Sequence, residues 1–167
     1  SPVRAGLTLL PATVLMMLLS PVTGRWGKEH GGRWPMALGA AITAGGFVSF
    51  LLLRPGGAWT VVLPGAVLLG LGLSLAVAPL TVVVLDSVRP ERAGIAAAVN
   101  NAIARLAGLL GVAVVPWAAG MSGLGRQMDP ALLTEGFHRA TLICAGLCVA
   151  ASIASVVWVP GAPSRAR

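Results

Sequence analysis

Apolar residues fill most of the chain in long runs, and charged residues are confined to short segments between them. The uncharged runs that reach 20 or more residues are 5–24, 34–53, 55–85, 106–125 and 140–164. A helix needs about 20 predominantly apolar residues to cross a bilayer. The pattern therefore predicts an all-α fold, a polytopic transmembrane helical bundle with five spans.

The charged positions and turn residues set the limits of these spans. Arg105 is expected inside the fourth span, because a start after Arg105 would leave a mostly apolar stretch in a loop. The segment 25–34 is expected to be a short basic loop, and the segment 122–137 a polar loop. The expected spans are about 5–24, 35–53, 59–85, 93–118 and 139–159, followed by a tail at 161–167.

Basic residues are shared unequally between the two sides of such a bundle. When successive loops alternate between the sides, seven Lys and Arg residues fall on one side and four on the other. Cytoplasmic loops carry the excess of Lys and Arg. We therefore expect a multi-pass protein of the inner (plasma) membrane, with the N-terminus of this chain outside and its C-terminus cytoplasmic.

Composition argues against several other classes of protein. Hydrophobic residues make up 56% and charged residues 10% of the chain, against about 25% charged residues in a soluble domain. The net charge of +7 is scattered in ones and twos, so nucleic-acid binding is not expected. We also expect no enzymatic activity, because neither an H-E-x-x-H motif nor clustered aspartates near a span end occur.

The two cysteines, Cys144 and Cys148, lie four residues apart in the last apolar run. No further His or Cys stands at metal-binding spacing, so they are interpreted as small residues packed on a helix. We expect neither a metal nor a cofactor.

The fourth span combines polar and small residues on one face. On a helix, Asn101 and Arg105 lie on the same side as Gly108. An arginine near the middle of a span costs about 2.5 to 3.5 kcal/mol, so it is expected to face the bundle interior or a watery cavity. Alternatively, Arg105 lies shallower and snorkels to the interface. The candidates for lining a substrate cavity or coupling helices are Asn100, Asn101 and Arg105.

All five acidic residues fall in expected loops or at span ends, so these spans offer no embedded carboxylate to carry a proton. His138, at the outer end of the last span, is interpreted first as an interfacial histidine and second as a proton relay. The acidic residues are Glu29, Asp86, Glu91, Asp129 and Glu135.

The passage from the third to the fourth span carries the most specific resemblance to a known family. It contains APLT at 78–81, PERAG at 90–94 and N-N-x-x-x-R-x-x-G-x-x-G at 100–111. Together with SPVRAGLTLLP at the start and GRWGKEHGGRWPM after the first span, it resembles the C-terminal part of the major facilitator superfamily's fourteen-span drug:proton antiporters, the EmrB/QacA type. The likeness covers nearly the whole chain.

The resemblance implies proton-coupled multidrug efflux by alternating access, in which two bundles rock about a central site. It also implies lipophilic small-molecule substrates, protons, membrane lipid and missing N-terminal helices as partners. Five spans make an incomplete major facilitator C-terminal half, so we expect a fragment that does not transport alone. A non-transporting membrane scaffold or assembly subunit is the alternative.

The segment 24–33 also resembles the superfamily's Gly-x-x-x-Asp-Arg-x-Gly-x-Arg motif. Gly24, Gly31 and Arg33 match, whereas Lys28 and Glu29 stand where the family usually has Asp and Arg. Both signs of charge remain, at exchanged positions. The residues expected to form a gate between loops are Glu29, Arg33, Glu91 and Arg92.

Overall fold

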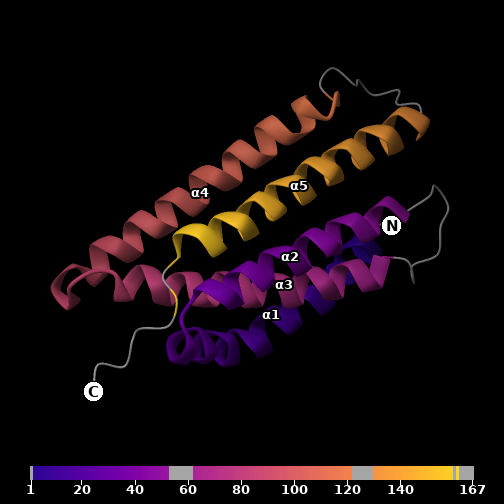
Figure 1. Cartoon of the computed structure of the whole chain (residues 1–167). Coiled ribbons are helices and arrows are strands. Elements are labelled where there is room, and N and C mark those ends of the chain that lie inside the picture. Colours follow the sequence, from indigo (N-terminus) through magenta and orange to yellow (C-terminus); the bar gives the residue numbers. More distant parts are fainter. Residues whose placement is uncertain (1, 53–61, 122–129, 160, 162–167) are drawn as a thin grey trace.

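Five long helices make up nearly all of the computed structural model, which describes residues 2–52, 62–121, 130–159 and 161 (Figure 1). For residues 2–9 and 130 it describes the backbone alone. Residues 59–61 of the expected third span and the expected tail beyond Gly161 lie outside this part. The helices are α1 (Pro2–His30), α2 (Arg33–Ser49), α3 (Val62–Asp86), α4 (Ala93–Ala118) and α5 (Pro130–Trp158), with short 3₁₀ turns η1 (Phe50–Leu52) and η3 (Pro90–Arg92).

Helix length and composition confirm the all-α membrane bundle. Four described helical stretches are long and apolar enough to cross a membrane. They are Arg33–Leu52, Val62–Asp86, Pro90–Ala118 and Ala131–Trp158. The first expected span lies within α1, where the side chains of residues 2–9 are outside the described part.

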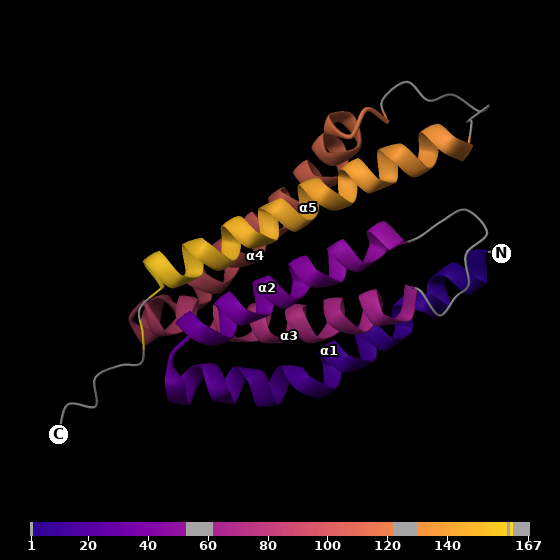
Figure 2. The ribbon, with the colours of Figure 1, turned by 45° about the vertical axis from the view of Figure 1, so that its right-hand side comes forward.

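The five helices lie roughly side by side (Figures 1 and 2), and four of them pack more closely than the fifth, α4. Helix α3 packs closely against both α1 and α2, and α2 also packs against α5. Helix α4 lies beyond α5, at the edge of the bundle (Figure 1), and carries no buried residue along its length. The compact part of the fold is therefore α1, α2, α3 and α5.

The interior of the bundle is made of small residues, and the large apolar residues lie outside. Apart from Met36, the buried hydrophobic residues are all alanines, and the buried polar residues are all Ser or Thr. In contrast, the side chains of Met17, Val112 and Trp158 are 78%, 79% and 82% exposed. In water such a surface would aggregate, whereas in lipid small residues let helix backbones approach and large ones meet acyl chains.

Close backbone contact between α2 and α3 depends on glycine. A Cβ atom added to Gly39 would lie 2.6 Å from the backbone nitrogen of Ala76 and 2.6 Å from the carbonyl oxygen of Gly72. One added to Gly72 would in turn lie 2.7 Å from the carbonyl oxygen of Gly39. Backbone atoms cannot move aside as a flexible side chain can. Gly39 and Gly72 therefore set the distance between the two helices.

The connection between α1 and α2 is much shorter than the loop expected over 25–34. Helix α1 continues to His30, and only Gly31 and Gly32 separate it from α2. Lys28 and His30 lie in the last turn of α1, where positive charge complements the helix dipole. Gly31 then adopts a φ of 83°, the left-handed conformation that ends many helices.

The start of α5 also differs from expectation, because the helix begins at Pro130 and includes the last eight residues of the expected loop at 122–137. Proline is well suited to a first helical position, since it has no N–H group to leave unpaired. Glu135 consequently lies in a helix rather than in a loop.

We predict opposite effects for two alanine substitutions in α2. Gly39→Ala should lower the free energy of unfolding by about 1–3 kcal/mol, because the new methyl group collides with the α3 backbone. Gly45→Ala should be neutral or raise it by up to about 1 kcal/mol, since nothing lies within 4 Å of its Cβ position. Thermal unfolding of the two variants in detergent checks this, and equal melting temperatures would contradict the close α2–α3 contact.

Candidate functional site

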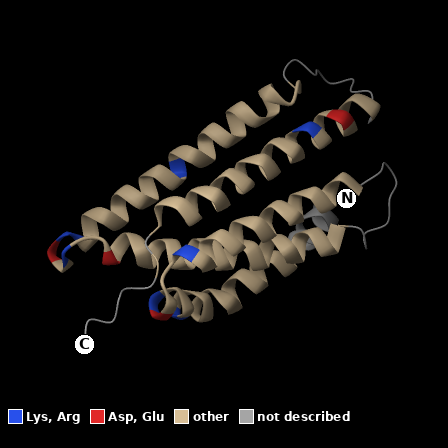
Figure 3. Ribbon diagram, viewed as in Figure 1, with Lys and Arg blue, Asp and Glu red and all other residues tan. Residues whose placement is uncertain are grey.

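Apart from one basic position midway along α4, the charged residues gather at the two ends of the bundle (Figure 3). One end collects the last turn of α1, the first of α2, the last of α3 and the η3 turn before α4 (Figure 1). Every residue expected to form the loop motif or the gate lies at this end. They are Gly24, Lys28, Glu29, Gly31, Arg33, Glu91 and Arg92.

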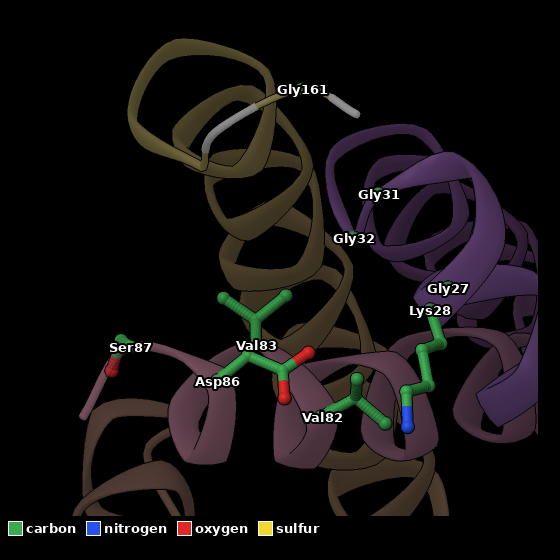
Figure 4. Close-up of a pocket in the computed structure, with 9 residues that line it drawn as sticks. All are labelled: Gly27, Lys28, Gly31, Gly32, Val82, Val83, Asp86, Ser87 and Gly161. Atoms are coloured by element: carbon green, nitrogen blue, oxygen red, sulfur yellow. The ribbon is translucent and has the colours of Figure 1, made fainter. Parts of the chain in front are cut away.

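A pocket of about 340 Å³ opens at this charged end. Its walls come from the end of α1, from Gly31 and Gly32, from the end of α3 and from Gly161 near the C-terminus. Lys28 extends from α1 toward α3, and the carboxylate of Asp86 extends from the end of α3 into the same space (Figure 4). The pocket thus holds both signs of charge on two different helices.

The pocket wall is positioned by a close crossing of α1 and α3. Thr23 Oγ1 donates a 2.8 Å hydrogen bond to the carbonyl oxygen of Ser74, and both residues are buried. One turn further along α1, a Cβ atom on Gly27 would lie 2.7 Å from the Cβ of Pro79. Gly27 therefore lets α1 lie directly against the fully buried Pro79. Lys28, the next residue, is brought to the end of α3 by this crossing.

The two glycines of the motif have different structural roles. A Cβ on Gly24 would lie 3.8 Å from that of Ala78, which is ordinary contact, so Gly24 packs against α3 without needing to be glycine. Gly31 needs its left-handed φ to turn the chain from α1 into α2. The glycine that the motif has at position 31 is therefore required by the backbone conformation there.

The expected gate residues do not pair with one another in this conformation. Glu29, Glu91 and Arg92 are exposed. Within the described ranges, the one salt bridge joins Arg139 to Glu135, at the opposite end of α5. Arg33 is half-buried, and its Nε atom is fully buried without a hydrogen-bond partner.

The end of the bundle opposite the pocket carries a smaller group of polar residues. The Glu135–Arg139 pair is exposed on α5, where such i,i+4 pairs contribute only about 0.3–0.5 kcal/mol. His138 is half-buried beside Phe137, with ring centroids 6.2 Å apart. Cys144 and Cys148 are half-buried free thiols further along the same helix.

The polar residues of α4 lie far from the pocket, near the middle of the helix. Asn100 is half-buried, whereas Asn101 and Arg105 are exposed. Added Cβ atoms on Gly108 and Gly111 would meet nothing within 4 Å. Within this chain, therefore, the polar and small face of α4 does not face the bundle interior.

Several residues that shape the site carried little signal in the sequence. Asp86 was seen only as an acidic residue at a span end, and its position opposite Lys28 depends on how α1 crosses α3. Thr23 and Ser74 resemble any small polar residue in an apolar run. Pro79 belongs to the APLT segment at 78–81, but its contact with Gly27 could not be foreseen from the sequence.

Comparison with known proteins places these features in a wider context. A sequence model of the Major Facilitator Superfamily matches residues 1–167. The tetracenomycin C resistance and export protein of Streptomyces glaucescens is 31% identical over 69% of this chain and 21% of its own length. The cephamycin export protein CmcT of Amycolatopsis lactamdurans is 32% identical over the whole chain and 33% of its own length.

A third relative is the multidrug resistance protein Stp of Mycobacterium tuberculosis, 30% identical over 69% of this chain and 21% of its own. The chain thus spans between about a fifth and a third of these relatives. No solved structure matches it.

We predict that the bond between Thr23 and Ser74 stabilises the α1–α3 crossing. Thr23→Val keeps the side-chain shape and removes the donor, so it should lower stability by about 0.6 kcal/mol and at most about 1.7 kcal/mol, the average and the maximum for interhelical hydrogen bonds in membranes. Thr81→Val is the control, because Thr81 is exposed and bonds only to Val77 of its own helix. Thermal unfolding compares the two, and an equal loss in both would exclude a crossing role for Thr23.

Proposed function

The chain belongs to the major facilitator superfamily, and from that premise we propose that it is the C-terminal part of a drug-exporting transporter. The proposed transporter is a fourteen-span drug:proton antiporter of the EmrB/QacA type that works by alternating access. Relatives named as export or resistance proteins support the direction of transport. Their length, about three times that of this chain, supports further helices outside it, which we propose to lie N-terminal to it.

The single observation that carries this proposal is the uncovered polar face of α4. Arg105 lies near the middle of a 26-residue apolar helix and is exposed within this chain. Facing lipid there, its guanidinium would be costly. Facing a watery cavity or polar groups of other helices, it would be stabilised. We therefore assign Asn101 and Arg105 to the surface between this bundle and the helices that complete the transporter.

Substrate chemistry follows from the same surface. A cavity lined by apolar side chains with a few polar groups selects lipophilic compounds by shape and by a small number of hydrogen bonds. Asn101 offers both a donor and an acceptor, and Arg105 offers donors alone. The proton-coupling acid is assigned to the helices outside this chain, because the acidic residues here lie at helix ends or in loops.

The charged end of the bundle is assigned to the cytoplasmic side of the inner membrane. Glu29, Glu91 and Arg92 are exposed there, free to pair with another bundle. In the proposed cycle they hold one state closed through contacts made only when the two bundles approach at this side. Their lack of pairing in the described part of the chain is compatible with that role.

We predict that Arg105 is required for export but not for membrane insertion. In the full transporter, Arg105→Ala or Arg105→Lys should reduce drug resistance by about tenfold or more. The reason is that a charge-assisted contact is worth about 1.5–3 kcal/mol, and 1.4 kcal/mol corresponds to tenfold. Resistance assays in cells, normalised to the amount of transporter in the membrane fraction, measure the effect.

Arg89→Gln is the matched control, since Arg89 is an exposed arginine in the segment just before η3. It should retain wild-type resistance. Wild-type resistance in both Arg105 variants would refute the assignment of Arg105. Absence of efflux from the unmodified full-length protein would instead favour the scaffold alternative.

The proposed orientation has its own test by cysteine labelling. In a background with Cys144→Ser and Cys148→Ser, the exposed residues Lys28 and Glu135 are replaced singly by cysteine. A membrane-impermeant maleimide should label Glu135→Cys in intact cells and Lys28→Cys only after the cells are opened. The reverse pattern would place the charged end outside.

A further inference from the structure

The pocket at the charged end brings together two ionisable side chains from different helices. Among the residues that line it, Lys28 of α1 and Asp86 of α3 are the two that carry charge. Both are exposed, and both extend into the pocket (Figure 4). Neither makes a salt bridge in the described part of the chain. A cation and an anion therefore share one open space of about 340 Å³.

No carboxylate stands at the positions nearest to Lys28 along its own helix and the turn that follows. On a helix, side chains three and four residues apart are neighbours, whereas adjacent residues do not face each other. Glu29 is adjacent to Lys28 and so points to another side of α1. The residues three and four positions from Lys28 are Gly24, Arg25, Gly31 and Gly32. A carboxylate for Lys28 therefore has to come from another helix.

Close contacts hold the backbones on the two sides of the pocket together. Gly27 lies directly against Pro79, and a Cβ atom on Gly32 would collide with the side chain of Val83. The end of α1 and the end of α3 are therefore already in contact. Lysine has a flexible four-carbon stem, so the two charged side chains can meet by rotation about their own bonds, without movement of the helices.

Water determines how strongly such a pair is held. Between exposed side chains an ion pair contributes little, because solvent screens the charges. When water is excluded, the effective dielectric constant falls and the attraction grows. Covering either charge without its partner is costly. A protein surface that covers this pocket therefore favours pairing of Lys28 with Asp86, and the pairing in turn favours the covered state.

We propose that Lys28 and Asp86 form an ion pair when the second bundle of the transporter covers this pocket, and that the pair stabilises the state closed on the cytoplasmic side. This inference rests on the proposed function, because it needs a second bundle. It adds Asp86 to the expected gate residues. The loop motif usually has Asp at position 28, so Lys28 reverses the charge there, and Asp86 supplies a carboxylate from across the pocket.

Charge exchange in the full-length transporter tests the pair. Lys28→Met and Asp86→Asn should each reduce drug resistance by about fivefold, the upper range for an ion pair near the surface. Each leaves the other charge to be covered without a partner. The double variant Lys28→Asp with Asp86→Lys restores both charges at exchanged positions, so it should recover resistance. Resistance is normalised to the amount of transporter in the membrane fraction.

A labelling experiment reads the closed state without requiring transport. In a background with Cys144→Ser and Cys148→Ser, Ser87→Cys places a thiol in the wall of the same pocket. A maleimide added to inside-out vesicles should label this thiol about fivefold faster in Lys28→Met, because the pocket is covered less often. Removal of a nearby cation by itself makes a thiol less reactive, so faster labelling reports access.

The matched control places the same two exchanged charges outside the pocket. Arg25 is exposed on α1 one turn before Lys28 and does not line the pocket, so Arg25→Asp with Asp86→Lys should stay impaired. Equal recovery by this control, no recovery by the Lys28 and Asp86 exchange, or unchanged labelling in Lys28→Met would each overturn the pair. Absence of efflux from the unmodified protein would instead contradict the proposed function, while the labelling rates would still decide whether the pair forms.

Discussion

Helices surrounded by hydrocarbon gain nothing from hiding apolar side chains from one another, so close backbone approach and hydrogen bonds must hold them together. The contact between Gly39 and Gly72 and the bond from Thr23 to Ser74 meet this constraint directly. The bond from Ser152 to Ala37 does the same between α5 and α2. The site at the charged end depends on these contacts, because they bring Lys28 and Asp86 to one pocket.

The same constraint explains why α4 differs from its neighbours. It has small residues at Gly108 and Gly111, suited to close packing, yet among the described residues nothing lies within 4 Å of their Cβ positions. It also carries Arg105, which is unsuited to lipid. A helix with an unused packing surface and an uncovered charge is expected where one bundle meets another. The proposed position of α4 in a larger transporter follows from this combination, and relatives several times longer are compatible with it.

The sequence was informative about the helices and less so about their contacts. Hydropathy identified the helical class, because a long uncharged run has few alternatives to a span. It missed the extension of α1 to His30, since Lys28 and Glu29 interrupt the apolar run while favouring helix locally. Lys28 and Asp86 line the same pocket because Gly27 of α1 packs against Pro79 of α3. This contact between residues far apart in the sequence leaves no pattern in it. Likewise, Arg33 matched a motif, but its missing acceptor became visible only once its neighbours were placed.

The central claim is that lipid, and not water, surrounds this bundle of small-residue contacts and exposed large apolar side chains. Extraction of membranes with alkaline sodium carbonate tests it most directly, because the treatment removes peripheral proteins and leaves bilayer-spanning ones in place. The polypeptide should remain entirely in the membrane pellet and be released only by detergent. Its recovery in the supernatant as an intact, monodisperse species would contradict the claim.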